Sequence, residues 1–325
     1  MGKKTVSPVS IFGARVLLKY LRAMQDELEG VVIGGDIEYV HRCRVASRRM
    51  RSALVLFGDF CFSKKDHKTL YTHMRKITRS LGMARDTDVQ IAFLTDVYQQ
   101  LSDPQLKSGI ERIILRVKQK RVKAQAKVID AVEYLADKDV LTGTRDKLNP
   151  LANKVQEDEQ TFDPTLYALA NESITSRLDE MLAYEPYIHD PANLEELHAM
   201  RISAKALRYT LESFESIYGT QLKETIQTMR ELQDALGLLH DLDVWIDWIP
   251  QFILQERKRV RAYFGHTRPL KRLLPGLEVF LIEQKNKRGT AYQEFIALWE
   301  RIEGDNVWEG LREVILISLK LEDQK

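Results

Sequence analysis

Residues 40–51 read VHRCRVASRRMR, and residues 197–208, about half a chain later, read LHAMRISAKALR. In each segment a histidine is followed by basic residues at the third, seventh and tenth positions after it. On a helix of 3.6 residues per turn these four positions span an arc of only about 80°. We name the two sets of four the first strip and the second strip. They pair as His41 with His198, Arg44 with Arg201, Arg48 with Lys205, and Arg51 with Arg208.

A second motif is repeated in the same order. Residues 81–89 read LGMARDTDV and residues 236–244 read LGLLHDLDV, with the same residue at five of the nine positions. From the histidine of each strip to the first aspartate of this motif the interval is 45 residues in the first copy (41 to 86) and 43 in the second (198 to 241). Two motifs repeated at nearly equal intervals indicate internal duplication.

Helical periodicity dominates the chain, and alternating strand patterns are nearly absent, so the sequence predicts an all-α fold. Glycines and prolines, among them Gly82, Gly237 and Pro250, are expected to end helices. We expect one domain over residues 1–325, with an N-terminal half at about 10–141, a linker at about 142–164 and a C-terminal half at about 165–320. The predicted helices cover residues 11–29, 36–57, 64–81, 86–101, 105–141, 165–183, 193–218, 222–236, 241–252, part of 255–287, and 292–320 with an interruption at Gly304.

The overall composition limits the possible functions. The 325 residues include 49 Lys plus Arg and 47 Asp plus Glu, a net charge of +2, so a strong positive field requires segregated charge. Two cysteines, Cys43 and Cys61, do not suggest a disulfide framework or a cysteine-based metal site. We expect no membrane partner, because no apolar run approaches the length of a membrane span. Cytoplasmic residence is the expected location.

The helix that carries each strip has an apolar stripe on its opposite face, which predicts that the strip faces away from the core. In the first copy this stripe is Cys43, Ala46, Met50, Leu54 and Phe57, and in the second it is Met200, Ser203, Leu207, Leu211 and Phe214.

The strips themselves predict anion binding. Arg44, Arg48 and Arg51 are like-charged neighbours with no acid between them, an arrangement that destabilises a helix unless an anion lies across it. Carboxylates of another helix could supply that charge, so a purely structural network is the alternative. Arginine favours phosphoryl groups through its planar fork. Because the strip from Arg44 to Arg51 is about 10 Å long, it suits a chain of phosphates better than a single one.

Further cations could extend the surface. Arg42 and Arg49 widen the first strip but correspond to alanines in the second, so we expect the first half to hold an anion more strongly. In the helix at 105–141 a basic row, Arg112, Arg116, Lys120, Lys123 and Lys127, fits a solvated face as well as a ligand site. The secondary anion-binding candidates are Arg42, Arg49, Arg15, Lys19, Arg22, Arg75, Arg79, Arg230 and Tyr209.

The Asp-x-Asp elements, Asp86/Asp88 and Asp241/Asp243, allow three interpretations. They could cap the helices that follow Gly82 and Gly237, pair with arginines, or share Mg²⁺ with bound phosphates. Capping or pairing is favoured. The sequence holds none of the common catalytic motifs, so we predict no catalytic residue, no cofactor and no resident metal.

The strips and the repeated Leu-Gly-to-Asp-x-Asp element closely resemble the CHAD family, the conserved histidine α-helical domain. His240 departs from that pattern, since it stands where an arginine is expected. The resemblance implies two pseudo-symmetric antiparallel bundles of about four helices each, a basic central cleft or pore, and binding of inorganic polyphosphate, sometimes at polyphosphate granules. Many members carry a fused CYTH-type triphosphatase domain, whose Glu-x-Glu-x-Lys motif does not occur here, so a stand-alone domain is expected.

The predicted function is therefore non-catalytic binding of inorganic polyphosphate through the two strips. A nucleic-acid-binding helical protein is the alternative, although the strips lack interleaved aromatic residues apart from Tyr209. A Mg²⁺-dependent phosphohydrolase is a third hypothesis, less favoured than the other two.

Overall fold

The computed structural model describes residues 7–154 and 163–320, with side chains described to residue 316. These residues form helices and turns and no strand, which confirms the all-α prediction. The first six helices are α1 (Pro8–Gln25), α2 (Leu28–Ile33), α3 (Ile37–Cys61), α4 (Lys64–Gln100), α5 (Pro104–Asp137) and α6 (Val140–Ala152). Then follow α7 (Pro164–Leu182), η1 (Glu185–Tyr187), α8 (Leu194–Tyr218), α9 (Lys223–Phe264), η2 (Arg268–Arg272), α10 (Leu274–Gly304) and α11 (Val307–Lys320).

Several helices begin where the sequence supplies a side-chain cap. The side chains of Ser7, Asp36 and Ser63 accept hydrogen bonds from backbone N–H groups in the first turns of α1, α3 and α4. Asp103 and Asp163 do the same for α5 and α7, each directly before a proline. Such caps satisfy N–H groups that have no partner inside the helix. The start of α3, which carries the first strip, is therefore encoded locally.

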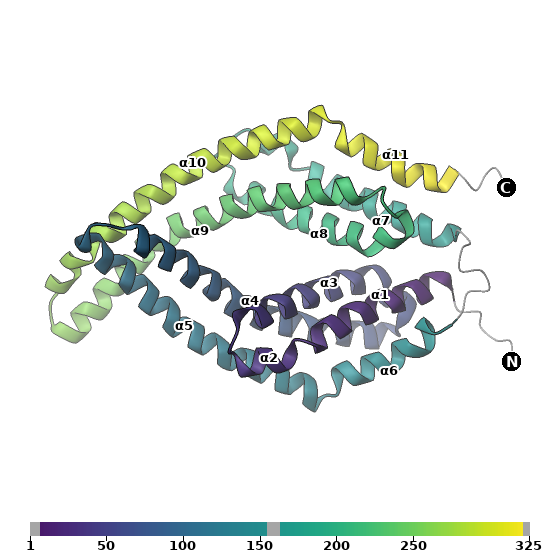
Figure 1. Ribbon diagram of the computed structural model, residues 1–325, viewed down its shortest axis with the longest axis horizontal. Helices are drawn as coiled ribbons and strands as arrows, with labels where there is room; N and C mark the ends of the chain where they lie inside the picture. The colour runs from purple at the N-terminus through teal and green to yellow at the C-terminus, as the bar shows by residue number, and fades with distance from the viewer. Residues whose placement is uncertain (1–6, 155–162, 321–325) are drawn as a thin grey trace.

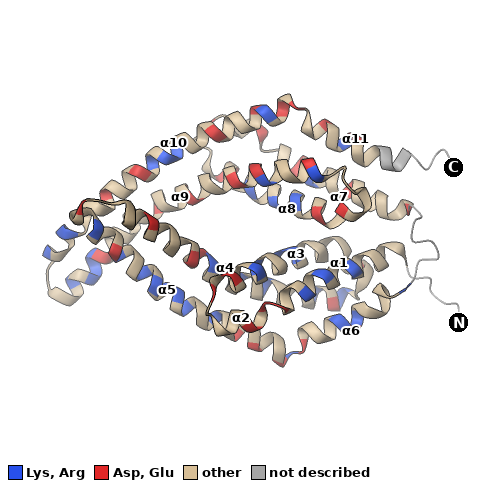
Figure 2. Ribbon diagram, viewed as in Figure 1, with Lys and Arg blue, Asp and Glu red and all other residues tan. Residues whose placement is uncertain are grey.

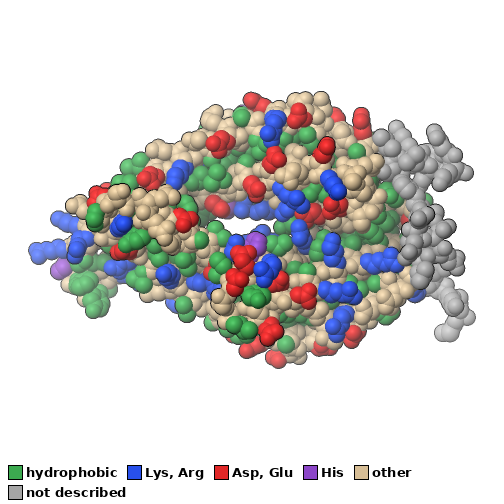
Figure 3. Space-filling view, in the orientation of Figure 1, with side chains coloured by type: hydrophobic (Ala, Val, Ile, Leu, Met, Phe, Trp, Pro, Cys, Tyr) green, Lys and Arg blue, Asp and Glu red, His purple; other side chains and the backbone are tan. Residues whose placement is uncertain are grey.

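The helices form two halves that meet at both ends of an elongated molecule (Figure 1). The first half contains α1, α3 and α6 with the adjoining parts of α4 and α5, and the second contains α7, α8 and α11 with the adjoining parts of α9 and α10. At one end α3 packs against α8 and α1 against α7. At the other, the long helices α5 and α10 pack together. Between these contacts, Figure 3 shows an opening with Lys, Arg, acidic and His side chains at its edge.

The contact between α3 and α8 is part of the main hydrophobic core. Phe12, Phe57 and Phe214 form a ring cluster there, with centroid distances of 5.7, 6.2 and 5.4 Å. Phe57 and Phe214 occupy equivalent positions of the repeat, each 16 residues after the histidine of its strip. Equivalent residues that contact each other are what a local two-fold axis produces. This cluster fixes α3 and α8 beside each other.

A second core lies at the far end and joins the outer parts of α4, α5, α9 and α10. Trp245 packs edge-on against Phe280 at 5.5 Å, and Phe93 lies 5.9 Å from Trp245. Leu94 of α4, Ile110 of α5 and other apolar side chains complete it. The two halves are thus joined by buried apolar side chains on both sides of the opening.

Helices α4 and α9 continue through residues that were expected to break them. Gly82 lies inside α4, and Gly237 and Pro250 lie inside α9, so the predicted boundaries near 81–86, 236–241 and 252 are wrong. Tertiary packing along both helices outweighs the helix propensity of these residues. The predicted interruption at Gly304 is confirmed, because α10 ends there.

Part of the expected linker is also helical. Residues 140–152 form α6, which packs against α1, so the N-terminal half continues past residue 141 to Ala152. Val140, Leu141 and Leu148 are buried along this helix, and their spacing places them on one apolar face. The acidic cluster that begins at residue 156 lies outside the described residues, apart from Asp163, which caps α7.

Candidate anion-binding site

Both strips lie on the sides of α3 and α8 that face away from the core, as predicted. In the first copy the apolar stripe is buried throughout, and in the second it is buried except at Ser203, which is half-buried. All eight strip residues are half-buried. Burial raises the pKa of the Cys43 thiol to about 12, in agreement with its interpretation as a small core residue. The helical periodicity of the sequence therefore correctly predicts which side of each helix carries the strip.

The structure brings the two strips together into one surface. Beyond the effect of burial, the charges of Arg48 and Arg201 lower the pKa of Arg44, and the charge of Arg48 lowers the pKa of Arg201. Lys205 of the second strip is influenced by Arg44 and Arg48 of the first. Figure 2 shows Lys and Arg along the adjacent helices α3 and α8. The strips are thus two sides of a single cationic surface, which we call the joint surface.

Three cations of the joint surface form no ion pair, although Asp241 lies near enough to Arg201 and Lys205 to oppose the lowering of their pKa by burial. Arg48, Arg201 and Lys205 form no hydrogen bond or ion pair with any residue that the structure describes. Within the described ranges, the buried Nε atoms of Arg44, Arg51, Arg201 and Arg208 also lack a hydrogen-bond partner. Unpaired buried donors of this kind destabilise a protein until an acceptor reaches them.

The electrostatic cost appears in the pKa values of these groups. Burial, followed by the charges of Arg201, Arg48 and Arg44, lowers the pKa of Lys205 to about 7. Burial is also the main cause that lowers the pKa of Arg44 and of Arg201. Burial and like charges disfavour the charged form of these groups in the unliganded protein. A bound anion would favour the charged form again.

The histidines that begin the two strips have different neighbours. His198 lies against His240, with their Nδ1 atoms 2.9 Å apart, and burial together with Arg201 lowers the pKa of His240 to about 4. Burial and then Arg85 lower the pKa of His41, whose Nδ1 is buried without a hydrogen-bond partner within the described chain. Both strip histidines are mainly neutral at pH 7, since burial also lowers the pKa of His198. A neutral imidazole can still donate one hydrogen bond to a phosphate oxygen.

Three of the four Asp-x-Asp carboxylates pair with arginines, and the elements lie inside helices rather than at their caps. Asp86 accepts a bond of 3.0 Å from Arg44, whereas Asp88 accepts one of 2.5 Å from Arg121 of α5. In the second half, Asp243 accepts one of 2.6 Å from Arg288 of α10. Because the elements lie inside helices, their two carboxylates point about 200° apart and cannot share one metal ion. The first aspartate thus faces the joint surface, and the second ties the neighbouring long helix to α4 or α9.

The glycines of the repeated motif lie beneath strip arginines. A Cβ added at Gly82 would lie 3.5 Å from Arg44 Nε, and one added at Gly237 would lie 3.9 Å from Arg201 Nε. Both are ordinary van der Waals distances, so a Cβ at either position would not displace the arginine. The arginine contact therefore does not explain the two glycines, which lie in the middle of a helix, where glycine lowers stability.

Two secondary candidates that were expected to strengthen the first strip are committed to carboxylates. Arg49 donates to Glu212 of α8 at 2.9 Å, which joins the two halves, and Arg42 donates to Glu27 at 2.8 Å. The expectation that they make the first half the stronger site therefore loses its basis. Internal carboxylates neutralise them, so they add little charge for a ligand.

Glu212 is an organising residue that the sequence interpretation missed. Its side chain, only 6% exposed, also accepts a bond of 3.1 Å from Arg208, and Arg230 lies 4.0 Å away. The spacing of four residues between Arg208 and Glu212 is the available sequence signal, since residues four apart on a helix are neighbours. Tyr71 was missed as well: its hydroxyl lies 3.3 Å from Arg51, and its ring lies 5.4 Å from that guanidinium.

The other secondary candidates are dispersed. Arg15 donates to the carbonyl oxygens of Ala152 and Lys154 at the end of α6, so it serves that helix terminus. Lys19, Arg22, Arg75 and Arg79 are exposed, and Tyr209 stacks beneath the Arg208 guanidinium at 5.0 Å. Of the basic row on α5, Arg112 and Arg116 bind the buried Glu256, and Lys120, Lys123 and Lys127 are exposed.

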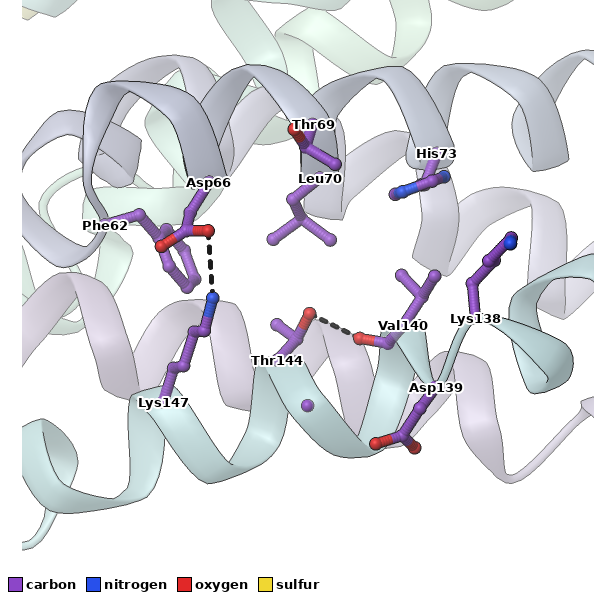
Figure 4. Close-up of a pocket in the computed structure, with 11 residues that line it drawn as sticks. Phe62, Asp66, Thr69, Leu70, His73, Lys138, Asp139, Val140, Thr144 and Lys147 are labelled. Atoms are coloured by element: carbon purple, nitrogen blue, oxygen red, sulfur yellow. Dashed lines mark hydrogen bonds and ion pairs between the residues drawn. The ribbon is translucent and has the colours of Figure 1, made fainter.

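A separate hollow of about 330 Å³ lies between α4 and α6 and contains no strip residue (Figure 4). Asp66 and Lys147 form an ion pair of 3.0 Å across it, and Thr144 donates to the carbonyl oxygen of Val140. No group of three or more metal-ligating side chains is found among the described residues. Within the same residues, every helix is too short or too polar to cross a membrane.

Comparisons with known proteins agree with the resemblance noted in the sequence. A family model described as the CHAD domain matches residues 15–250. The crystal structure of the CHAD domain from the plant Ricinus communis is similar, with a TM-score of 0.64 and 20% identity over 92% of this chain and 93% of that one. PptA from Streptomyces chartreusis is also similar, with a TM-score of 0.58 and 14% identity over 90% of this chain and 100% of that one. No curated protein matches the chain. Since the family model covers well over half of its length, the chain belongs to the CHAD domain family.

Proposed function

We propose that this protein binds inorganic polyphosphate, without catalysis, along the joint surface of α3 and α8. The observation that carries the proposal is the set of unpaired cations Arg48, Arg201 and Lys205, which come from both strips and lie within each other's electric field. A structural network would pair them with carboxylates, as it does Arg49. A bound chain of phosphates would supply the missing charge to both strips at once.

The ligand class follows from geometry and donor type. From its first to its last basic residue each strip is about 10 Å long, so the two together exceed the reach of one phosphate and offer repeated contacts to a polymer. Arginines with free Nε–H groups favour phosphoryl oxygens, because two parallel bonds can form to one group. Membership of the CHAD domain family is consistent with this ligand. Cytoplasmic location, with association to polyphosphate granules, is part of the proposal.

The test is charge reversal at the unpaired arginines. We expect Arg48→Glu combined with Arg201→Glu to weaken the binding of long-chain polyphosphate by more than about a hundredfold, because two charge-assisted contacts of roughly 1.5–3 kcal/mol each are lost. Titration calorimetry at fixed salt would measure the change. In the unmodified protein, affinity should fall steeply with added salt, as it does for any ligand held by several phosphates.

A matched control changes the net charge equally at another place. Lys120→Glu with Lys123→Glu alters two exposed residues of α5 and should leave binding within about threefold, since exposed charges are largely screened. Circular dichroism would show that both double variants retain their helices. Equal affinity of the Arg48/Arg201 variant and the unmodified protein would refute the site.

The alternatives are separated by two further measurements. Phosphate release from polyphosphate or nucleotides with Mg²⁺ would indicate the phosphohydrolase. Three of the four Asp-x-Asp carboxylates are bonded to arginines, which does not favour it. Competition between polyphosphate and RNA or DNA at fixed salt would test nucleic-acid binding along the same surface. We expect polyphosphate to win, because the two aromatic rings beside the strips, Tyr209 and Tyr71, already lie against Arg208 and Arg51.

A further inference from the structure

The far end of the molecule contains a second concentration of positive charge, well separated in sequence from the strips. Figure 3 shows basic, apolar and histidine side chains together at this end, where α9 turns into α10. Segment 257–272 reads RKRVRAYFGHTRPLKR, with seven Lys or Arg residues and no acid. Its functional role is not explained by the joint surface.

A cavity of about 470 Å³ opens here between α5, α9 and η2. At its base the carboxylate of Glu256 is fully buried and accepts bonds from three arginines. Arg116 Nε and Nη2 lie 2.7 and 3.2 Å from its oxygens, Arg259 Nη1 lies 2.6 Å away, and Arg112 Nη1 lies 3.4 Å away. Burial opposes ionisation of Glu256, but the bonds from Arg116 and Arg259 hold its pKa below the usual value. One ionised carboxylate against three guanidinium groups leaves a surplus of two positive charges.

The same carboxylate fixes the three guanidinium groups in place. Arg112 uses only one Nη for Glu256, so its other N–H groups remain available to a ligand. All three arginine side chains are partly exposed, between 25% and 46%. A set of oriented donors beside a cavity is an arrangement suited to a phosphate group, because little ordering is needed when the ligand binds.

The wall of the cavity is aromatic and apolar. Glu256, Arg259, Val260 and Tyr263 follow a spacing of three and four residues, which places them on one face of α9. Tyr263 is 83% exposed and Phe264 52% exposed, with their rings 4.7 Å apart. Large rings that are left in water beside fixed cations are suited to stacking against a planar ligand. The cavity therefore combines arginines that can bind phosphate with aromatic rings on which a planar group can stack.

We propose that this cavity binds a nucleoside phosphate, with the phosphates on Arg112, Arg116 and Arg259 and the base stacked on Tyr263. This site is independent of the polyphosphate function proposed for the joint surface. Since the wall offers rings and few polar groups, it requires an aromatic base but selects weakly among bases. The size of the cavity falls in the range typical of small-ligand sites.

The test compares ATP with tripolyphosphate, which carries the same phosphates without the nucleoside. Calorimetry in the absence of Mg²⁺ should show ATP binding roughly tenfold more tightly, the contribution expected from one stacked base. Saturation-transfer NMR should show the adenine protons in contact with the protein. Tyr263→Ser should reduce ATP to the affinity of tripolyphosphate and remove the adenine signal, whereas Arg259→Met should weaken both ligands.

Two controls keep the result unambiguous. Tyr187→Ser alters another exposed tyrosine, on η1, and should leave ATP binding unchanged. The Arg48→Glu/Arg201→Glu variant should retain the adenine signal, because it does not alter this cavity. The proposal is overturned if ATP binds no more tightly than tripolyphosphate, if Tyr263→Ser leaves ATP affinity unchanged, or if the strip variant abolishes ATP binding.

Discussion

Of the five arginines in residues 41–51 three are paired with carboxylates, whereas of the three Lys or Arg residues in 198–208 only Arg208 is. Arg44 binds Asp86, and the flanking Arg42 and Arg49 bind Glu27 and Glu212. In the second strip, Arg201 and Lys205 form no ion pair with the described residues, although Asp241 is near enough to act on both. Residues 41–51 contain five arginines, yet a smaller fraction of their positive charge is left without an ion pair.

The number of cations in a segment therefore differs from the number that are free to bind a phosphate. A carboxylate that already holds a guanidinium must be displaced, or its repulsion accepted, before a phosphate binds to the same arginine. Free cations, in contrast, destabilise the unliganded fold and favour the complex. We therefore expect the paired arginines, such as Arg44 and Arg208, to influence folding more and the unpaired cations to influence binding more.

The largest effect is expected at the carboxylate that joins the two strips. Glu212→Gln removes the charge that Arg49, Arg208 and Arg230 share, and should lower the free energy of unfolding by about 2–3 kcal/mol, below the usual range for fully buried pairs because the arginines are partly exposed. Urea denaturation would measure it. The more exposed Glu38→Gln, which frees Arg85, should cost less than about 1 kcal/mol. Equal losses would contradict the organising role of Glu212.

A slightly smaller effect is expected at Arg201, where one substitution should weaken binding and at the same time stabilise the unliganded fold. Arg201→Met should weaken polyphosphate binding by at least about tenfold, because one charge-assisted contact is lost. It should also raise the melting temperature of the unliganded protein, since burial and Arg48 disfavour the charge of Arg201. Arg208→Met, which leaves Glu212 with fewer partners, should lower the melting temperature instead. A loss of stability in both variants would remove the distinction between paired and unpaired cations.

The third effect is a dependence on pH that belongs to the second strip. The pKa of Lys205, about 7 in the unliganded protein, should rise when phosphates bind, so binding takes up a proton. Affinity should therefore fall, by about tenfold, as the pH rises from below to above 7. Lys205→Arg should flatten this profile, because arginine stays protonated. Calorimetry in buffers of different ionisation enthalpy would measure the proton uptake, and an unchanged profile in the variant would contradict the assignment.

The smallest effect is expected where the copies differ in the motif that follows the strip. His240→Arg gives the second copy the arginine that the first copy has at the equivalent position, Arg85. Arg85 pairs with Glu38. Glu195 occupies the position equivalent to Glu38, so the new arginine should pair with it and change polyphosphate affinity by less than about twofold. A larger gain in affinity would show that position 240 adds to the joint surface directly.

The sequence was sufficient to predict what depends on helical spacing. The strips, their apolar stripes from Cys43 to Phe57 and from Met200 to Phe214, and the all-α class all follow from periodicity within single helices. Helix boundaries were harder to predict, because Gly82 and Gly237 are breakers by propensity. Their helices continue since the packing of α5 alongside α4 and of α10 alongside α9 outweighs the local cost.

The pairing of charges could not be predicted, because it depends on contacts between helices distant in sequence. Asp88 meets Arg121 and Arg49 meets Glu212 across 33 and 163 residues. For the same reason the sequence did not reveal that the strips adjoin, or that Arg112 and Arg116 share a buried carboxylate with Arg259. Residue types indicated the chemistry, and only the packing of whole helices determined which cations remained free.

The two hydrophobic cores give the duplicated chain a consequence for how it unfolds. Each core contains side chains from both repeats, so neither half retains a complete interior when the other is absent. Tandem repeats often melt independently, but here the repeats are bound at both ends of the molecule. The protein should therefore lose its structure in one cooperative transition, and neither repeat should be stable when produced alone. We therefore expect the duplicated chain to fold as one unit.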